Sequence, residues 1–138
     1  MDSINLIISS SQNNEGERSN IQVDAKGKLY TKSGTDYIVY DEPEGTGLDG
    51  TTTTVKVKEG KVTLIRSGMT NMKQIFFPGE KTESIYKTPY GNFLVEVDAQ
   101  NVEVQKFDNE IKIYLEYNLR VAGESVGHQT LNLTAIKP

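Results

Sequence analysis

The sequence contains no cysteine and one histidine among its 138 residues. Disulfide bonds and thiolate metal sites are therefore excluded, and a protein-only zinc site would need several Cys or His ligands. We expect no metal and no other cofactor. A chain of this length buries about 70% of the surface that its unfolded form exposes, so residues 1–138 can fold as one domain without crosslinks.

Positive charge is also scarce. Lys and Arg number 15 against 19 Asp and Glu, which gives a net charge of −4. This balance argues against nucleic acid and against anionic membrane surfaces as partners. No apolar run approaches the ~20 residues of a membrane span, and the first residues lack the basic region of a signal peptide. We expect a cytoplasmic protein, and the oligomeric state stays open.

Helical periodicity is nearly absent, whereas alternation with a period of two residues is widespread. The clearest case runs from Glu110 to Val121, where apolar residues occupy one face and mostly charged or polar residues the other. This pattern predicts a long half-buried strand. The apolar face comprises Ile111, Ile113, Leu115, Tyr117, Leu119 and Val121.

Shorter alternating runs with turn residues between them predict about ten or eleven strands in all. The other runs lie at 4–8, 21–31 with a kink at Gly27, 37–42, 52–58, 61–67, 72–77, 84–87, 93–97, 102–104 and 126–136. Regular short strands are typical of a β-sandwich or a β-barrel. We favour an all-β fold with a single closed antiparallel barrel, because closure removes the exposed edges of long strands.

Residues 45–50 match the G-x-G-x-x-G pattern of dinucleotide-binding loops. That function requires a helix to begin at the loop, so that its N-terminus faces the pyrophosphate. The residues that follow, Thr51 to Val57, are β-branched and alternating, which predicts a strand. The pattern therefore indicates a loop at the rim of the barrel.

Arg66 shares a face with Val62 and Leu64, which directs it toward the interior if the strand stays regular. An isolated buried charge is costly, so the guanidinium must be paired or hydrated. It could bind the carboxylate or phosphate of a ligand. Alternatively, it forms a structural ion pair with an inward acidic residue such as Glu42, or lies hydrated at the rim.

Tyr40 and Glu42 share a face with Ile38 near the end of one predicted strand. Gln74 lies between Met72 and Phe76, but Ile75 and Phe77 occupy the opposite face, so its direction is open. Together with Arg66, these three residues are our candidate ligand-binding residues. No catalytic residue is assigned, and His128 is expected on the outer face, opposite Leu131 and Leu133.

Several stretches in order resemble the YwiB-like family, small bacterial proteins with a domain of unknown function. These stretches are residues 37–42 (YIVYDE), 53–57 (TTVKV), 66–68 (RSG), 72–76 (MKQIF), Gly79 and 86–91 (YKTPYG), followed by the closing hairpin. The resemblance runs from about Ile4 to Thr134. It implies a calycin-like, lipocalin-type β-barrel and brings no known activity. The matching positions include Tyr40, Glu42, Arg66, Gly68, Met72, Gln74, Tyr86 and Gly91, whereas Pro43 departs from the pattern.

Three hypotheses about function follow. The leading one is a barrel that binds a small, partly apolar ligand in its interior, with Arg66 orienting an anionic head group. The second is a protein-interaction module with a packed, ligand-free core, in which Arg66 and Glu42 form an internal pair. The third is an enzyme at the barrel mouth with Glu42 and Tyr40 as acid–base groups.

Overall fold

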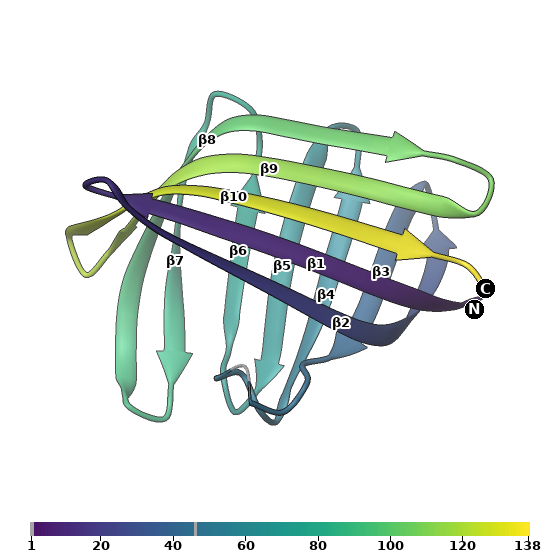
Figure 1. Cartoon of the computed structure of the whole chain (residues 1–138), viewed down its shortest axis with the longest axis horizontal. Coiled ribbons are helices and arrows are strands. Elements are labelled where there is room, and N and C mark those ends of the chain that lie inside the picture. The colour runs from purple at the N-terminus through teal and green to yellow at the C-terminus, as the bar shows by residue number, and fades with distance from the viewer. Residues whose placement is uncertain (1, 46) are drawn as a thin grey trace.

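The computed structural model describes residues 2–45 and 47–138, which form ten strands in one antiparallel sheet. The sheet order is β6-β5-β4-β3-β2-β1-β10-β9-β8-β7. The sheet curls on itself, with β8, β9, β10, β1 and β2 crossing in front of β3 to β7 (Figure 1). The strands are β1 (Asp2–Asn14), β2 (Glu17–Lys32), β3 (Thr35–Asp41), β4 (Thr51–Lys58), β5 (Lys61–Gly68), β6 (Met72–Phe76), β7 (Lys81–Thr88), β8 (Gly91–Lys106), β9 (Glu110–Val121) and β10 (Glu124–Ile136).

Four hairpins share one kind of tight turn. In each, a non-glycine residue with φ near +50° precedes a glycine with positive φ. Positive φ at both central residues defines the type I′ turn, whose twist matches that of the flanking strands. These turns fix the register of each hairpin, so that the two strands pair antiparallel from the first residues on either side of the turn. The pairs are Glu15-Gly16, Ser33-Gly34, Glu59-Gly60 and Ala122-Gly123.

The two longest strands, β2 and β8, have 16 residues each and pass from one layer to the other. In β2 the pairing with β3 begins at Gly27, where a Cβ atom would lie 2.5 Å from the Val39 carbonyl oxygen. The kink expected at Gly27 therefore coincides with a close approach of backbones. In β8 the register shifts at a bulge between Ala99 and Asn101. The expectation of separate strands at 93–97 and 102–104 is wrong, because a bulge bends a strand without ending it.

The barrel is nearly closed, with a seam where β6 and β7 meet. Asn71 and Lys87 exchange two backbone hydrogen bonds of 2.8 Å, and these are the backbone hydrogen bonds that join the two sides of the seam among the described residues. The turn between the strands is attached to the β8 bulge, since Ala99 exchanges hydrogen bonds with Gly79 and Glu80. The antiparallel barrel predicted from the alternation is confirmed, and it closes through a bridge and side chains rather than a full ladder.

The core lies on the inner face of the sheet. Ile111, Ile113 and Leu115 of β9 are buried, and Tyr117 packs its ring edge-on against Phe76 across the interior. The face predicted for residues 110–121 is therefore confirmed. At one end of the barrel, the Asp36 carboxylate of β3 lies 2.5 Å from Lys106 Nζ of β8. Because β3 and β8 are not neighbours in the sheet, this ion pair joins the two layers.

Candidate functional site

A cavity of about 290 Å³ occupies the barrel interior. Its walls are mostly Val, Leu and Ile side chains from strands of both layers, and two charged side chains, Glu42 and Arg66, contribute to the lining. Ile21 of β2 lines the cavity yet is 61% exposed. The cavity therefore reaches solvent beside the first half of β2.

Strand register brings the polar lining residues together. Tyr40 of β3 lies opposite Thr53 of β4, which lies opposite Arg66 of β5, which lies opposite Met72 of β6. Side chains of residues directly opposite each other point to the same face of a sheet. Tyr40, Thr53 and Arg66 thus form a row across three strands, and Glu42 lies two residues beyond Tyr40 on the same face.

The Glu42 carboxylate is held by a threonine hydroxyl. Thr53 Oγ1 donates a hydrogen bond of 2.5 Å to Glu42 Oε2, and the Tyr40 hydroxyl lies near enough to feel the Glu42 charge. Burial raises the pKa of Tyr40 well above its ordinary value, and the neighbouring Glu42 charge raises it further. Tyr40 therefore stays a neutral hydrogen-bond donor throughout the physiological range, and it is a poor base.

Arg66, in the same row, has a buried polar atom that lacks a hydrogen-bond partner. Its Nε atom is buried and has no hydrogen-bond partner, and no ion pair to Arg66 occurs in residues 2–45 and 47–138. The internal Arg66–Glu42 ion pair is therefore wrong, and the Glu42 carboxylate instead accepts a hydrogen bond from Thr53. The Arg66 charge acts on Tyr40 and on Tyr117 from across the barrel, lowering the pKa that burial raises in both.

Gln74 faces the interior and is 1% exposed, which settles the direction that the sequence left open. Its Nε2 donates to Thr82 Oγ1 at 2.6 Å, and its Oε1 accepts from Ser84 Oγ at 2.6 Å. Thr82 Oγ1 donates onward to the Ile75 carbonyl. Both ends of the Gln74 amide are thus engaged across the seam between β6 and β7, although the side chain also lines the cavity.

Two residues near Arg66 were not among the candidates from sequence: Tyr117, which lines the cavity, and Thr53, which is buried between Tyr40 and Arg66. Thr53 sits within a run of four threonines, where only the register against Tyr40 and Arg66 reveals that its hydroxyl is buried. Tyr117 was assigned to the apolar face of β9, and its approach to Arg66 depends on barrel closure.

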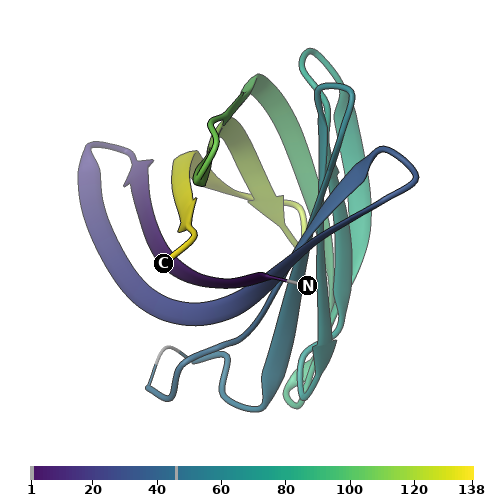
Figure 2. The same ribbon diagram turned by 90° about the vertical axis from the view of Figure 1, so that its right-hand side faces the viewer.

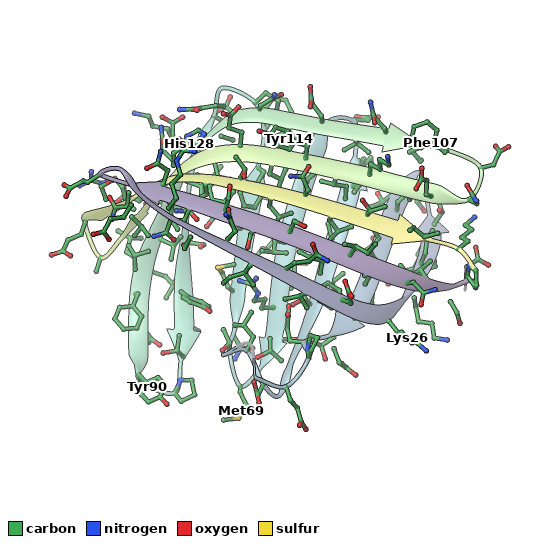
Figure 3. All side chains as sticks on the ribbon, in the orientation of Figure 1. Lys26, Met69, Tyr90, Phe107, Tyr114 and His128 are labelled. Carbon is green, nitrogen blue, oxygen red and sulfur yellow. The ribbon has the colours of Figure 1, made fainter. Side chains whose placement is uncertain are left out.

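Of the two other sequence features, His128 lies outside the cavity, whereas the glycine-rich loop contributes Leu48 to its lining. His128 contacts outer-face residues of β9, with Nε2 2.9 Å from Glu116 Oε2 and Nδ1 3.2 Å from Asn118 Oδ1 (Figure 3). In the glycine-rich loop, Thr46 lies outside the described residues, and the Asp49 carboxylate accepts hydrogen bonds from Gly45 N. The strand β4 follows this loop, as expected.

The described part of the chain contains no helix long and apolar enough to cross a membrane. Within the same residues, no group of three or more His, Cys, Asp or Glu side chains is arranged to hold a metal ion.

Comparison with known proteins agrees with the barrel architecture. The chain is 27% identical over 131 residues to the uncharacterized beta-barrel protein YwiB of Bacillus subtilis, covering 95% of this chain and 91% of that protein. The crystal structure of ywiB protein from Bacillus subtilis superposes with a TM-score of 0.88 at 26% identity, covering 99% of this chain and 92% of that one. Residues 6–133 match the family model described as domain of unknown function DUF1934, and the chain therefore belongs to the DUF1934 family.

Proposed function

We propose that this protein binds a small, largely apolar monoanion inside the barrel, with the head group on Arg66. The observation that carries the proposal is the buried Arg66 Nε, which has no partner among the described residues and belongs to a side chain that lines a mostly apolar cavity. A buried polar group without a hydrogen bond costs about 1–3 kcal/mol. A ligand anion would remove that cost, and an apolar wall with few polar groups is the usual small-molecule site.

The size of the cavity bounds the ligand. An engineered protein cavity of about 150 Å³ holds benzene, which has six carbon atoms. A cavity of about 290 Å³ is roughly twice as large, so it accommodates on the order of a dozen non-hydrogen atoms. A medium-chain or aromatic carboxylate is of this size.

Charge selects a monoanion. Arg66 contributes the one positive side chain among the cavity-lining residues, and Glu42 contributes one negative side chain. A carboxylate on Arg66 leaves the binding site with a single net negative charge. A phosphate dianion adds a second negative charge close to Glu42, and like charges in a partly dry interior repel strongly.

The two other hypotheses have less support. A packed, ligand-free core conflicts with a cavity of about 290 Å³. An enzyme with Tyr40 as base conflicts with the raised pKa of that hydroxyl, which burial causes first. A cytoplasmic location and a lipocalin-type mode of binding are part of the proposal.

The first test is native mass spectrometry on protein purified gently from its own source. We expect an adduct of a few hundred daltons or less on the wild type that is absent from Arg66→Met. Arg120→Met is the matched control, because the Arg120 side chain is exposed and donates to the Gly123 carbonyl outside the cavity. This control variant should keep the adduct.

A defined probe pair makes the test independent of the natural ligand. Decanoate has twelve non-hydrogen atoms, and decan-1-ol has a similar chain without the charge. A hydrogen bond to a charged group contributes about 1.5–3 kcal/mol, so calorimetry should show about 10- to 100-fold weaker decanoate binding to Arg66→Met. The affinity for decan-1-ol should be nearly unchanged. Equal decanoate affinity for wild type and Arg66→Met, in a variant that is folded, contradicts the assigned role of Arg66.

A further inference from the structure

The first half of β2 is a free strand edge. β2 pairs with β1 from Glu17 onward, but its pairing with β3 starts at Gly27. No backbone hydrogen bond from another described residue reaches the outer side of residues 17–25. Figure 2 shows β2 as the outer border of its layer, with β1 on its inner side. A row of unpaired N–H and C=O groups is a template for another strand.

Turn geometry decides which residues present those groups. Asn14 and Glu17 flank the type I′ turn and form a hydrogen-bonded pair, so odd-numbered residues of β2 direct their backbone groups toward β1. At the other end of the strand, Lys32 and Thr35 flank the next such turn, and even-numbered residues bond β3. The free edge therefore consists of the backbone groups of Arg18, Asn20, Gln22 and Asp24, and Lys26 marks the point where pairing with β3 begins.

This edge is complementary to itself. If a second copy pairs antiparallel about Ile21, Arg18 of each copy lies opposite Asp24 of the other, and Asn20 lies opposite Gln22. All outward backbone groups then face outward groups, as an antiparallel ladder requires. A shift of the symmetry centre by one residue, to Gln22, sets Arg18 opposite Lys26, and like charges directly opposite are destabilising. The charges therefore favour one register.

We propose that two copies of this chain associate by antiparallel pairing of their β2 edges, centred on Ile21. The side chain of Ile21 is 61% exposed in the single chain, and pairing covers it with the same residue of the second copy. Figure 3 places Lys26 at the outer border of β2, where the paired segment ends. An interface of one strand from each copy is small, so the dimer is weak and forms at high protein concentration.

The absence of cysteine from the sequence makes the register directly testable. Opposed residues of a non-hydrogen-bonded pair have Cα atoms about 4.5 Å apart, which a disulfide can span. Ile21→Cys should therefore form disulfide-linked dimers under mild oxidation. Val23→Cys alone should not, because two Val23 positions lie about 13 Å apart along the paired strands. A mixture of Ser19→Cys and Val23→Cys chains should crosslink, since those positions face each other.

Charge exchange provides the second arm. Arg18→Asp and Asp24→Arg should each lower the dimer fraction in analytical ultracentrifugation by several fold, and the double variant should restore it. Equal crosslinking of Ile21→Cys and Val23→Cys overturns the proposal, as does a wild-type chain that stays monomeric at about 1 mM. A dimer that ignores both charge changes also overturns it, because its interface would lie elsewhere. The inference does not depend on the ligand in the barrel.

Discussion

Replacing Gln74 by leucine tests how the barrel is closed. The substitution keeps a side chain of similar size but removes the hydrogen bonds to Thr82 and Ser84, both 2.6 Å long. A neutral side-chain hydrogen bond contributes about 1 kcal/mol net, so the two together contribute about 2 kcal/mol. Thr82 keeps its bond to the Ile75 carbonyl, and Ser84 is only half-buried, so solvent can replace its lost partner. We expect Gln74→Leu to lower the free energy of unfolding by about 2 kcal/mol.

Thermal denaturation should show this loss as a fall in Tm of about 6–10 °C for a chain of this length. Amide hydrogen exchange locates the effect, because the bridge between Asn71 and Lys87 should lose protection before the β1–β10 ladder does. Gln129→Leu is the matched control, since Gln129 is also buried but makes one long hydrogen bond of 3.3 Å, to the Val126 carbonyl. A Gln74→Leu protein as stable as the wild type, with the Asn71 and Lys87 amides still protected, would refute the assignment of Gln74 to the seam.

Three further predictions follow from the structure. Gly127→Ala should lower the free energy of unfolding by about 2 kcal/mol or more in thermal denaturation, because φ is +95° and a Cβ atom would overlap the Asn13 carbonyl. Gly16→Ala is its control: φ is +85° but the space around it is open, so the loss should be about 1 kcal/mol. Burial alone raises the pKa of Asp36, but hydrogen bonds from Lys106 and Thr31 bring it below its ordinary value of 3.8. Its stabilising contribution is therefore present above about pH 4 and is lost as the pH falls through the lower folded pKa. Asp36→Asn should be less stable by about 1 kcal/mol at pH 7 and should lose less stability on acidification, and equal acid denaturation curves contradict this. Tyr40→Phe should remove one of the tyrosines that ionise only at unusually alkaline pH in an absorbance titration of the folded protein, since burial raises its pKa.

The fold was largely predictable, because the alternation of apolar and polar residues and the residue types of the turns can both be read from short stretches of sequence. The face of Glu110 to Val121 follows from period two alone, and each X-Gly turn needs only local positive φ. The bulge in β8 was not predictable, because Ala99 is an ordinary strand residue. Its backbone is engaged by Gly79 and Glu80, residues about twenty positions away in the chain. Contacts made by the curling of the sheet leave no periodic trace in the sequence.

The candidate site was predictable in composition but not in its bonding. Period two correctly placed Arg66, Tyr40 and Glu42 toward the interior, and all three line the cavity. The alternative of an Arg66–Glu42 ion pair was wrong. Two opposite charges on one face of a sheet need not pair, because a hydroxyl group can hydrogen-bond the carboxylate instead. Thr53 lies between Tyr40 and Arg66 in the row, and its hydroxyl donates a hydrogen bond to the Glu42 carboxylate. Only the register of three strands reveals this arrangement.

Satisfaction of hydrogen bonds separates the two inward polar residues, Gln74 and Arg66, that sequence alone treats alike. Gln74 is more deeply buried, but both ends of its amide are engaged across the seam, so it holds the barrel shut. Arg66 is less buried, yet its Nε has no partner within the described residues. A polar atom that folding buries without a partner lowers stability, whereas a bound anion recovers that loss only when ligand is present. Ligand binding therefore gains the hydrogen-bond energy that Arg66 lacks in the unliganded protein. For the same reason, a folded Arg66→Met protein should equal or exceed the wild type in stability.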